Sequence, residues 1–268
     1  MEIIMQYLSG VCTDIGIKKK VNQDAALIRE AETEKGNVIL AVICDGMGGL
    51  EKGELASATV INRMSEWFET DFPNLLYHDF TAITIKNSWM QLVLRMNDQI
   101  RNYGEQRNIQ LGTTMAALLL VEDAYYICNV GDSRIYYLDN GMRQITRDQS
   151  YIQQEIDMER MTEEEALKSN KRNVLLQCIG VSNQVIPDFY FGEYKESSAF
   201  LLCSDGFRHV IGNQEMWDML RPDLLESEQD IESKIIKLIE LIKDRQEEDN
   251  ITAGIIYTRG DTNNEIIS

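Results

Sequence analysis

The sequence has little of the material that marks membrane, nucleic-acid-binding or secreted proteins. Its 268 residues include 3 prolines and 2 histidines, and no apolar run approaches the ~20 residues of a membrane-spanning helix. Lys and Arg total 26 against 44 for Asp and Glu, which gives a net charge of -18. Such a surface repels phosphate backbones and anionic lipids, so we expect neither nucleic acid nor a membrane as partner.

Linkers and repeats are also missing. No Ser-, Gly- or Pro-rich stretch divides the chain, and we find no internal repeat and no low-complexity tract. With 44% hydrophobic residues, the chain is long enough to bury a sizeable core. We therefore expect one domain over residues 1–268, acting as a monomer.

The cysteines show no arrangement typical of disulfides or zinc sites. Their number is odd, no CxxC spacing occurs, and at least three lie in apolar runs, as expected of small buried residues in a reducing compartment. The start, MEIIMQYLSG, carries an early glutamate and no basic region, unlike a signal peptide. We expect a cytoplasmic protein. The five cysteines are Cys12, Cys44, Cys128, Cys178 and Cys203.

Short apolar runs rich in branched residues predict buried strands. The three residues between the second and third runs, and the Asp-Asn-Gly after residue 138, predict two hairpins. Apolar residues at three- and four-residue steps predict helices around 55–68, 92–103 and 231–242. Grouped strands and separate helices favour an α+β fold in which helices pack on antiparallel sheets. The predicted strands are 38–44, 115–121, 125–130, 135–138, 199–203 and 251–257.

The polar stretch 149–173 interrupts this pattern. It is dense in charge and has little apolar periodicity before Val174. We expect an exposed, flap-like insertion, and a plain surface helix is the alternative.

Aspartates flank four of the predicted strands. Asp45 follows the first, Asp132 lies in the turn after the third, Asp205 follows the fifth and Asp249 precedes the last. One such aspartate is common in turns, whereas four in Gly- or Asn-containing turns form a pattern. If these strand ends meet, the carboxylates need a cation, and hard oxygen ligands favour magnesium, manganese or calcium over zinc.

The glycine-rich turn in CDGMGGLEKGE supports a metal rather than a nucleotide. It supplies neither the GxxxxGK[ST] of a P-loop nor the GxGxxG of a dinucleotide-binding turn. Its glycines would let the backbone approach an ion, with the carbonyl of Gly46 as a possible ligand.

At this point the chain resembles the metal-dependent protein serine/threonine phosphatases of the PP2C (PPM) type, and bacterial members in particular. Seven segments carry the resemblance in the order typical of the family and span nearly the whole chain. They are TDIGIKKKVNQDA (13–25), CDGMGGLEKGELAS (44–57), LGTTMAALLL (111–120), NVGDSR (129–134), ITRDQS (145–150), LLCSDGF (201–207) and DNIT (249–252).

The resemblance implies two packed antiparallel sheets flanked by helices on both sides, an α-β-β-α sandwich. It implies catalytic Asp45 bridging two Mn²⁺ or Mg²⁺ ions, with Asp205 and Asp249 completing one site and the Gly46 carbonyl the other. Asp24 would support the second ion from outside its set of direct ligands.

A third ion, found in many bacterial members, would take Asp132 and Asp205 as ligands. Water activated by the ions would hydrolyse phosphoserine or phosphothreonine in a protein, without a covalent intermediate. A cognate kinase, or the targets of one, would be natural partners.

Several positions depart from the family pattern. Lys19 stands where the family usually has an arginine that binds the substrate phosphate. A lysine supplies positive charge but cannot donate the two parallel hydrogen bonds of a guanidinium. Gln23 replaces a carboxylate behind the second ion, which should weaken that ion's binding. Met47, after the Asp-Gly pair, cannot donate a proton. Gln149, where histidine is frequent, is interpreted as a loop substitution with little catalytic meaning.

The two histidines, His78 and His209, are interpreted as ordinary surface residues, with His209 kept as a weak candidate near the site because it follows Asp205 by four residues.

Two rival hypotheses remain open. Cys128 and Arg134 have the C-x5-R spacing of cysteine-dependent phosphatases, although Asp132 would repel the phosphate inside such a loop. Alternatively, the chain is a catalytically weak, phosphatase-like regulatory or partner-binding module, which the substitution at Lys19 would allow. The retained aspartates count against that alternative.

Overall fold

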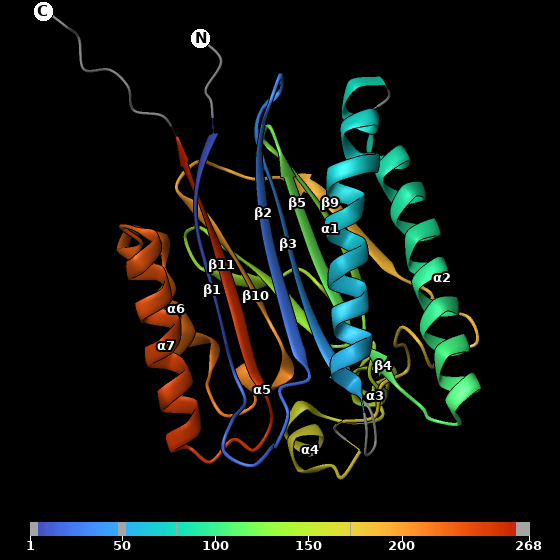
Figure 1. Ribbon diagram of the computed structural model, residues 1–268. Coiled ribbons are helices and arrows are strands. Elements are labelled where there is room, and N and C mark those ends of the chain that lie inside the picture. Colours follow the sequence, from blue (N-terminus) through green and yellow to red (C-terminus); the bar gives the residue numbers. More distant parts are fainter. Residues whose placement is uncertain (1–4, 48–51, 79, 172, 261–268) are drawn as a thin grey trace, which may run out of the picture.

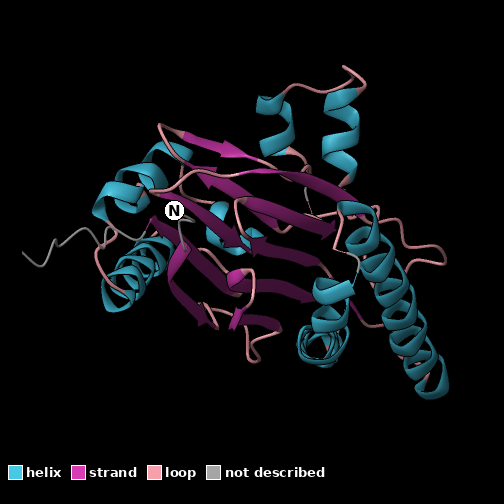
Figure 2. Cartoon of the chain, turned by 90° about the horizontal axis from the view of Figure 1, so that it is seen from above, coloured by secondary structure: helices cyan, strands magenta, loops and turns pink. Residues whose placement is uncertain are grey.

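Two antiparallel β-sheets lie face to face at the centre of the molecule, and helices cover both outer faces (Figure 1; Figure 2). The computed structural model describes residues 5–47, 52–78, 80–171 and 173–260. The α+β sandwich expected from the sequence is therefore confirmed. No helix among these described residues is long and apolar enough to cross a membrane.

The first sheet has the strand order β1-β11-β10-β7-β8. All its neighbours are antiparallel, and β7 and β8 form the hairpin that the Asp-Asn-Gly stretch predicts. Its strands are β1 (Met5–Asp14), β7 (Arg134–Leu138), β8 (Met142–Gln144), β10 (Ser198–Cys203) and β11 (Ile251–Gly260).

The second sheet has the order β2-β3-β5-β6-β9, and a short strand, β4, also pairs with β3. The hairpin predicted between residues 121 and 125 is the β5–β6 connection. The strands are β2 (Asp24–Thr33), β3 (Gly36–Met47), β4 (Gly112–Thr113), β5 (Met115–Val121), β6 (Ala124–Val130) and β9 (Asp188–Glu193).

Alternation along the strands sorts the apolar side chains into three layers of core. In β3, Leu40 and Val42 face the helices of the second sheet, whereas Ile39 and Ile43 face the first sheet. Because successive side chains point to opposite faces of a strand, one fully apolar run can serve two layers at once. The third layer lies between the first sheet and the helix α7 (Glu228–Asp244).

Long helices close the outer layers. The pair α1 and α2 covers the second sheet, while α6 and α7 lie on the opposite side of the molecule, against the first (Figure 1). The stripes predicted within 55–68, 92–103 and 231–242 are buried in α1, α2 and α7, except that Leu55 is exposed and Tyr103 is partly exposed. The helices here are α1 (Gly53–His78), α2 (Ala82–Arg107), α5 (Asp205–Arg208), α6 (Asn213–Leu220), η1 (Pro222–Leu224) and α7 (Glu228–Asp244).

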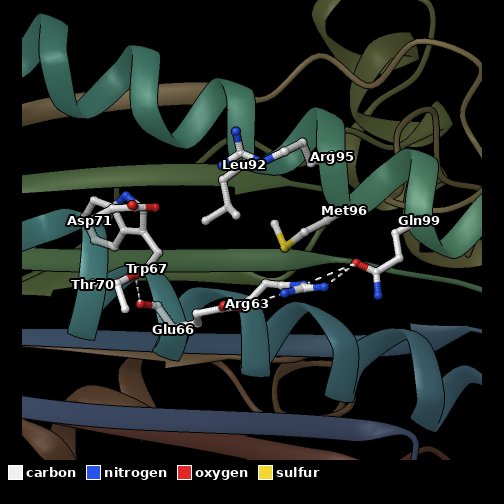
Figure 3. A pocket seen from close by; sticks show the side chains of 9 residues that line it. All are labelled: Arg63, Glu66, Trp67, Thr70, Asp71, Leu92, Arg95, Met96 and Gln99. Atoms are coloured by element: carbon white, nitrogen blue, oxygen red, sulfur yellow. Dashed lines mark hydrogen bonds and ion pairs between the residues drawn. The ribbon is translucent and has the colours of Figure 1, made fainter.

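A cavity of about 330 Å³ opens between α1 and α2 (Figure 3). The side chains of Trp67, Leu92 and Met96 form its apolar wall, and Arg63 ties the helices together through Gln99. Its lining contains none of the aspartates that flank the predicted strands. The chemistry that the sequence predicts therefore lies elsewhere.

The segment 149–173 contains two short helices, α3 (Tyr151–Asp157) and α4 (Glu163–Lys168). Thr162 caps α4, and a bridge from Ser150 to Leu175 closes the segment. Most of its described side chains are partly or fully exposed. Its action as a flap stays a prediction.

Candidate active site

The pairing of β2 with β3 places two carboxylates side by side. Asp24 begins β2 and Asp45 lies near the end of β3, and the two are direct partners in the antiparallel register. Asp24 is buried, whereas Asp45 retains some exposure. Two acidic groups therefore lie side by side at the end of the second sheet where β2 begins and β3 ends.

Two further aspartates come from the ends of β10 and β11, which are antiparallel neighbours. Asp205 follows β10 as the first residue of α5, and Asp249 precedes β11. A Cβ atom on Gly206 would lie 2.2 Å from the backbone oxygen of Asn250, so only glycine permits this contact between the two turns. A Cβ atom on Gly206 would also lie 3.4 Å from the Cβ atom of Asp249, so the turns that carry Asp205 and Asp249 touch.

Asp132 completes the group from the turn after β6. Gly131, with a φ of 98°, makes the sharp turn that a residue with a side chain would resist. Asp132 is 6% exposed.

The electrostatics show that these side chains converge. Burial raises the pKa of Asp45 well above its usual range, and the charges of Asp24, Asp205, Asp132 and Asp249 raise it further. Four other carboxylates thus act on Asp45 from separate parts of the sequence.

Burial also raises the pKa of Asp24, to about 7, with Asp205 and Asp249 adding to the shift. Within the described part of the chain, neither carboxylate oxygen of Asp24 meets the geometry of a hydrogen bond, although the hydroxyls of Thr252 and Ser204 lie near enough to oppose the rise. Oδ1 of Asp205 is likewise buried with no hydrogen-bond partner among the described residues. Buried oxygens without partners are costly, so this site calls for a cation.

The residues fit a divalent metal ion by the chemistry of their oxygens. In the described part of the chain, no three His, Cys, Asp or Glu side chains form a ready-made ligand set. Magnesium commonly keeps several waters and takes only one or two carboxylates, so such a set is not required.

Gly46 and Gln23 lie beside the carboxylates, in a close backbone contact. The Gly46 amide donates to the Gln23 carbonyl at 3.1 Å, and Ser57 Oγ donates to the same carbonyl at 2.6 Å. A Cβ atom on Gly46 would lie 2.3 Å from the carbonyl oxygen of Gly53. Gly46 is therefore packed against the start of α1; Gly48 and Gly49 lie outside the described residues.

Lys19 lies at the edge of the cluster, with its Nζ 2.7 Å from Oδ1 of Asp249. Burial lowers its pKa, but the hydrogen bond and charge of Asp249 and the charges of Asp45 and Asp205 outweigh this and raise it overall. The neighbouring Lys18 pairs with Glu248. Lys19 is thus a charged group within reach of a phosphate at the aspartates.

The interpretation of His209 as an ordinary surface residue is wrong. Its side chain is 19% exposed, with Nε2 3.4 Å from Oδ2 of Asp205 and Nδ1 3.4 Å from Oε2 of Glu247. Burial lowers its pKa, but the hydrogen bond to Glu247 and the charge of Asp205 raise it overall. His78, by contrast, is exposed as expected.

Gln149 is more than a loop substitution. Its Oε1 accepts from the Gly131 amide at 2.9 Å, while its Nε2 donates to the Ile186 carbonyl and to Asp188. An amide can accept and donate at once, as this buried position demands. Gln149 holds the turn that carries Asp132.

The structure gives no support to a cysteine nucleophile. Cys128 is fully buried in β6, and burial together with Asp188 raises its thiol pKa, which disfavours the reactive thiolate. Arg134, the arginine of the C-x5-R spacing, is bound to Asp148 through Nε and Nη2, each at 2.8 Å. Neither group is available to a phosphate.

Sequence analysis missed Arg208. Its side chain is 12% exposed and its Nη2 lies 3.3 Å from Oδ2 of Asp132. Its position three residues after Asp205, inside an apolar segment, was the available signal.

Known proteins resemble this chain over most of its length. The family model described as protein phosphatase 2C matches residues 17–252. A putative protein phosphatase 2C-type protein of Streptococcus pyogenes is 31% identical over 93% of this chain and 96% of its own. A serine/threonine phosphatase, stp, of Listeria innocua is 32% identical over 91% and 93%.

Solved structures of serine/threonine phosphatases have a similar fold. Serine/threonine phosphatase Stp1 of Staphylococcus aureus has a TM-score of 0.80 at 29% identity, over 96% of this chain and 97% of its own. The catalytic domain of the serine/threonine protein phosphatase PstP, solved in complex with 2 manganese ions, has a TM-score of 0.76 at 25% identity over 96% and 99%.

Proposed function

This chain belongs to the protein phosphatase 2C family, and from that premise we propose that it hydrolyses phosphoserine and phosphothreonine in proteins at the aspartate cluster, with Mn²⁺ or Mg²⁺ as cofactor. The observation that carries the proposal is the convergence of Asp24, Asp45 and Asp205, because oxygens of Asp24 and Asp205 are buried with no hydrogen-bond partner among the described residues. A folded protein gains nothing from such an arrangement unless a cation binds there.

The proposed ligands are Asp45, Asp205 and Asp249 with the Gly46 carbonyl, for two ions in the core site. Asp24 would orient the site without binding the ions directly, since it is buried and is paired with Asp45 across β2 and β3. Gln23 would do so from the position before β2, where its carbonyl accepts from the Gly46 amide. Bound divalent ions lower the pKa of water and neutralise charge on phosphoryl oxygens, which permits direct attack on phosphorus without a covalent intermediate.

The loop that carries Lys19 is held in place by one buried side chain. Asn250 donates from Nδ2 to the carbonyls of Ile15 and Val21, at 2.9 and 3.3 Å, and accepts from the Gln23 amide at 2.9 Å. These bonds tie both ends of the loop to the start of β11. Lys19 is therefore positioned next to Asp249, where its ammonium group can contact the substrate phosphate.

We also propose that the partners are phosphoproteins, including a cognate serine/threonine kinase or its targets, met in the cytoplasm. Relatives named as serine/threonine phosphatases support phosphoprotein substrates.

The test is phosphate release from a phosphothreonine peptide with added Mn²⁺, repeated with excess EDTA. We expect turnover with Mn²⁺ and none with EDTA. Activity that persists in EDTA would contradict a metal mechanism and return attention to Cys128. Metal binding in calorimetry without turnover would instead support the regulatory module.

Replacing Lys19 with alanine is expected to raise KM for the phosphopeptide several-fold, because a charged contact to the phosphate is lost. Lys19→Arg should leave KM equal or lower, since a guanidinium adds a second donor in the same position. Lys20→Ala, which removes the exposed neighbouring lysine, is the matched control and should leave KM unchanged. An unaltered KM in Lys19→Ala would refute this role.

A further inference from the structure

Both aspartates of the expected third metal site already face a basic side chain, Arg208 at the end of α5 or His209 directly after it. Nη2 of Arg208 lies 3.1 Å from the backbone oxygen of Asp132 and 3.3 Å from its Oδ2. The next residue, His209, approaches Oδ2 of Asp205 at 3.4 Å. A cation between these aspartates would therefore meet groups that compete for the same oxygens.

Arg208 belongs to a compact set of four charges. Its Nη2 also reaches Oδ2 of Asp148 at 3.4 Å, and Asp148 is bound at 2.8 Å by both Nε and Nη2 of Arg134. Asp132, Asp148 and Arg208 have side-chain exposures of 9%, 7% and 12%, and Arg134 of 22%. Two arginines thus balance two carboxylates where little water can contribute.

The balance has a direct consequence for metal binding. Buried carboxylates attract a cation most strongly when no basic group lies against them, and the guanidinium of Arg208 already offsets part of the charge of Asp132. A divalent ion on Asp132 would also lie close to a guanidinium that stays protonated throughout the working range of the enzyme. Repulsion between like charges is strong in such a poorly solvated place.

We propose that the Arg208 guanidinium takes the place of the third metal ion, so that this chain binds two divalent ions and Asp132 is a partner of Arg208 rather than a metal ligand. The proposal rests on the proposed function, since it concerns the same aspartate cluster. It makes Arg208 a positioning residue, which fixes the turn of Asp132 next to Asp205. The expectation of a third ion on Asp132 and Asp205 does not fit this structure.

The test counts bound metal. Equilibrium dialysis against Mn²⁺, followed by metal analysis, should find two ions per wild-type chain, in salt that screens weak binding to the acidic surface. Asp132→Asn should leave the count at two. Three ions in the wild type, falling to two in Asp132→Asn, would overturn the proposal while leaving the phosphatase assignment intact. Fewer than two bound ions per chain would contradict both this proposal and the proposed two-ion core site.

Variants of Arg208 provide the second arm. Arg208→Gln leaves Asp132 without its cation, so we expect the count to rise from two to three, and the double variant with Asp132→Asn to return to two. Arg208→Lys keeps the charge and should stay at two. A count of two in folded Arg208→Gln would contradict the proposal. Circular dichroism verifies folding, and if Arg208→Gln does not fold, the wild-type and Asp132→Asn counts decide.

Discussion

Asp205→Asn is expected to lower kcat for a phosphothreonine peptide by roughly a thousandfold, which corresponds to about 4 kcal/mol of transition-state stabilisation. The neutral amide weakens metal binding at the point where β10 ends, and stabilisation of phosphoryl charge by divalent ions is lost with it. The carboxylate of Asp205 also repels Asp24 and Asp45. Its removal relieves repulsion in the metal-free protein, so the variant should remain folded.

The measurement is steady-state phosphate release at saturating Mn²⁺, with far-UV circular dichroism as a check on folding. Asp218→Asn is a matched control, because it makes the same chemical change on the exposed side of α6. The control should retain wild-type kcat. If Asp205→Asn retained kcat within about tenfold, a loss of only about 1.4 kcal/mol, Asp205 could not be an essential ligand.

The metal-free protein is expected to lose stability as pH rises from about 4 to about 7. Burial raises the pKa of Asp24 from 3.8 to about 7, and nearby aspartates add to the shift. Between these values the folded state keeps a proton that the unfolded state has released. The free energy of unfolding therefore falls with pH across this window, by an amount on the order of a few kcal/mol, and levels off above it.

Urea unfolding in EDTA at several pH values checks this expectation, with Asp24→Asn beside the wild type. The variant lacks the titrating group, so its stability should fall less steeply over the same window. The free energy of unfolding of the variant should still fall with pH, because burial and the charge of Asp205 also raise the pKa of Asp132 to about 7. Saturating Mn²⁺ should restore wild-type stability near neutral pH, since a ligand of the folded state stabilises it. Equal slopes in the two proteins would contradict the burial effect assigned to Asp24.

The sequence patterns predict the interior strands of both sheets but not the edge strands β1, β2 and β9 or the short strand β4, and they indicate the edge strand β8 only through its hairpin. The six predicted runs are β3, β5, β6, β7, β10 and β11, and each lies between two other strands. Packing on both faces makes such strands continuous apolar runs. Among the described residues, β1, β2 and β9 each pair with a single strand, and their half-exposed faces tolerate charged residues such as Arg29 and Glu30. Because of this polar composition, these strands do not form the apolar runs from which the other strands are predicted.

Four aspartates of the candidate site could be found from the sequence by itself, because each lies at the end of a predicted strand in a turn: Asp45, Asp132, Asp205 and Asp249. Asp24, at the start of the missed strand β2, was indicated by the resemblance to the family. What surrounds them depended on the tertiary structure. The distances from Arg208 to Asp132 and from Gln149 to Gly131 join residues 76 and 18 positions apart. No local pattern encodes such pairings, since they arise only when the ends of both sheets meet. That meeting brings Arg208 against Asp132 and gathers Asp24, Asp45 and Asp205 at the site where we propose that metal ions bind.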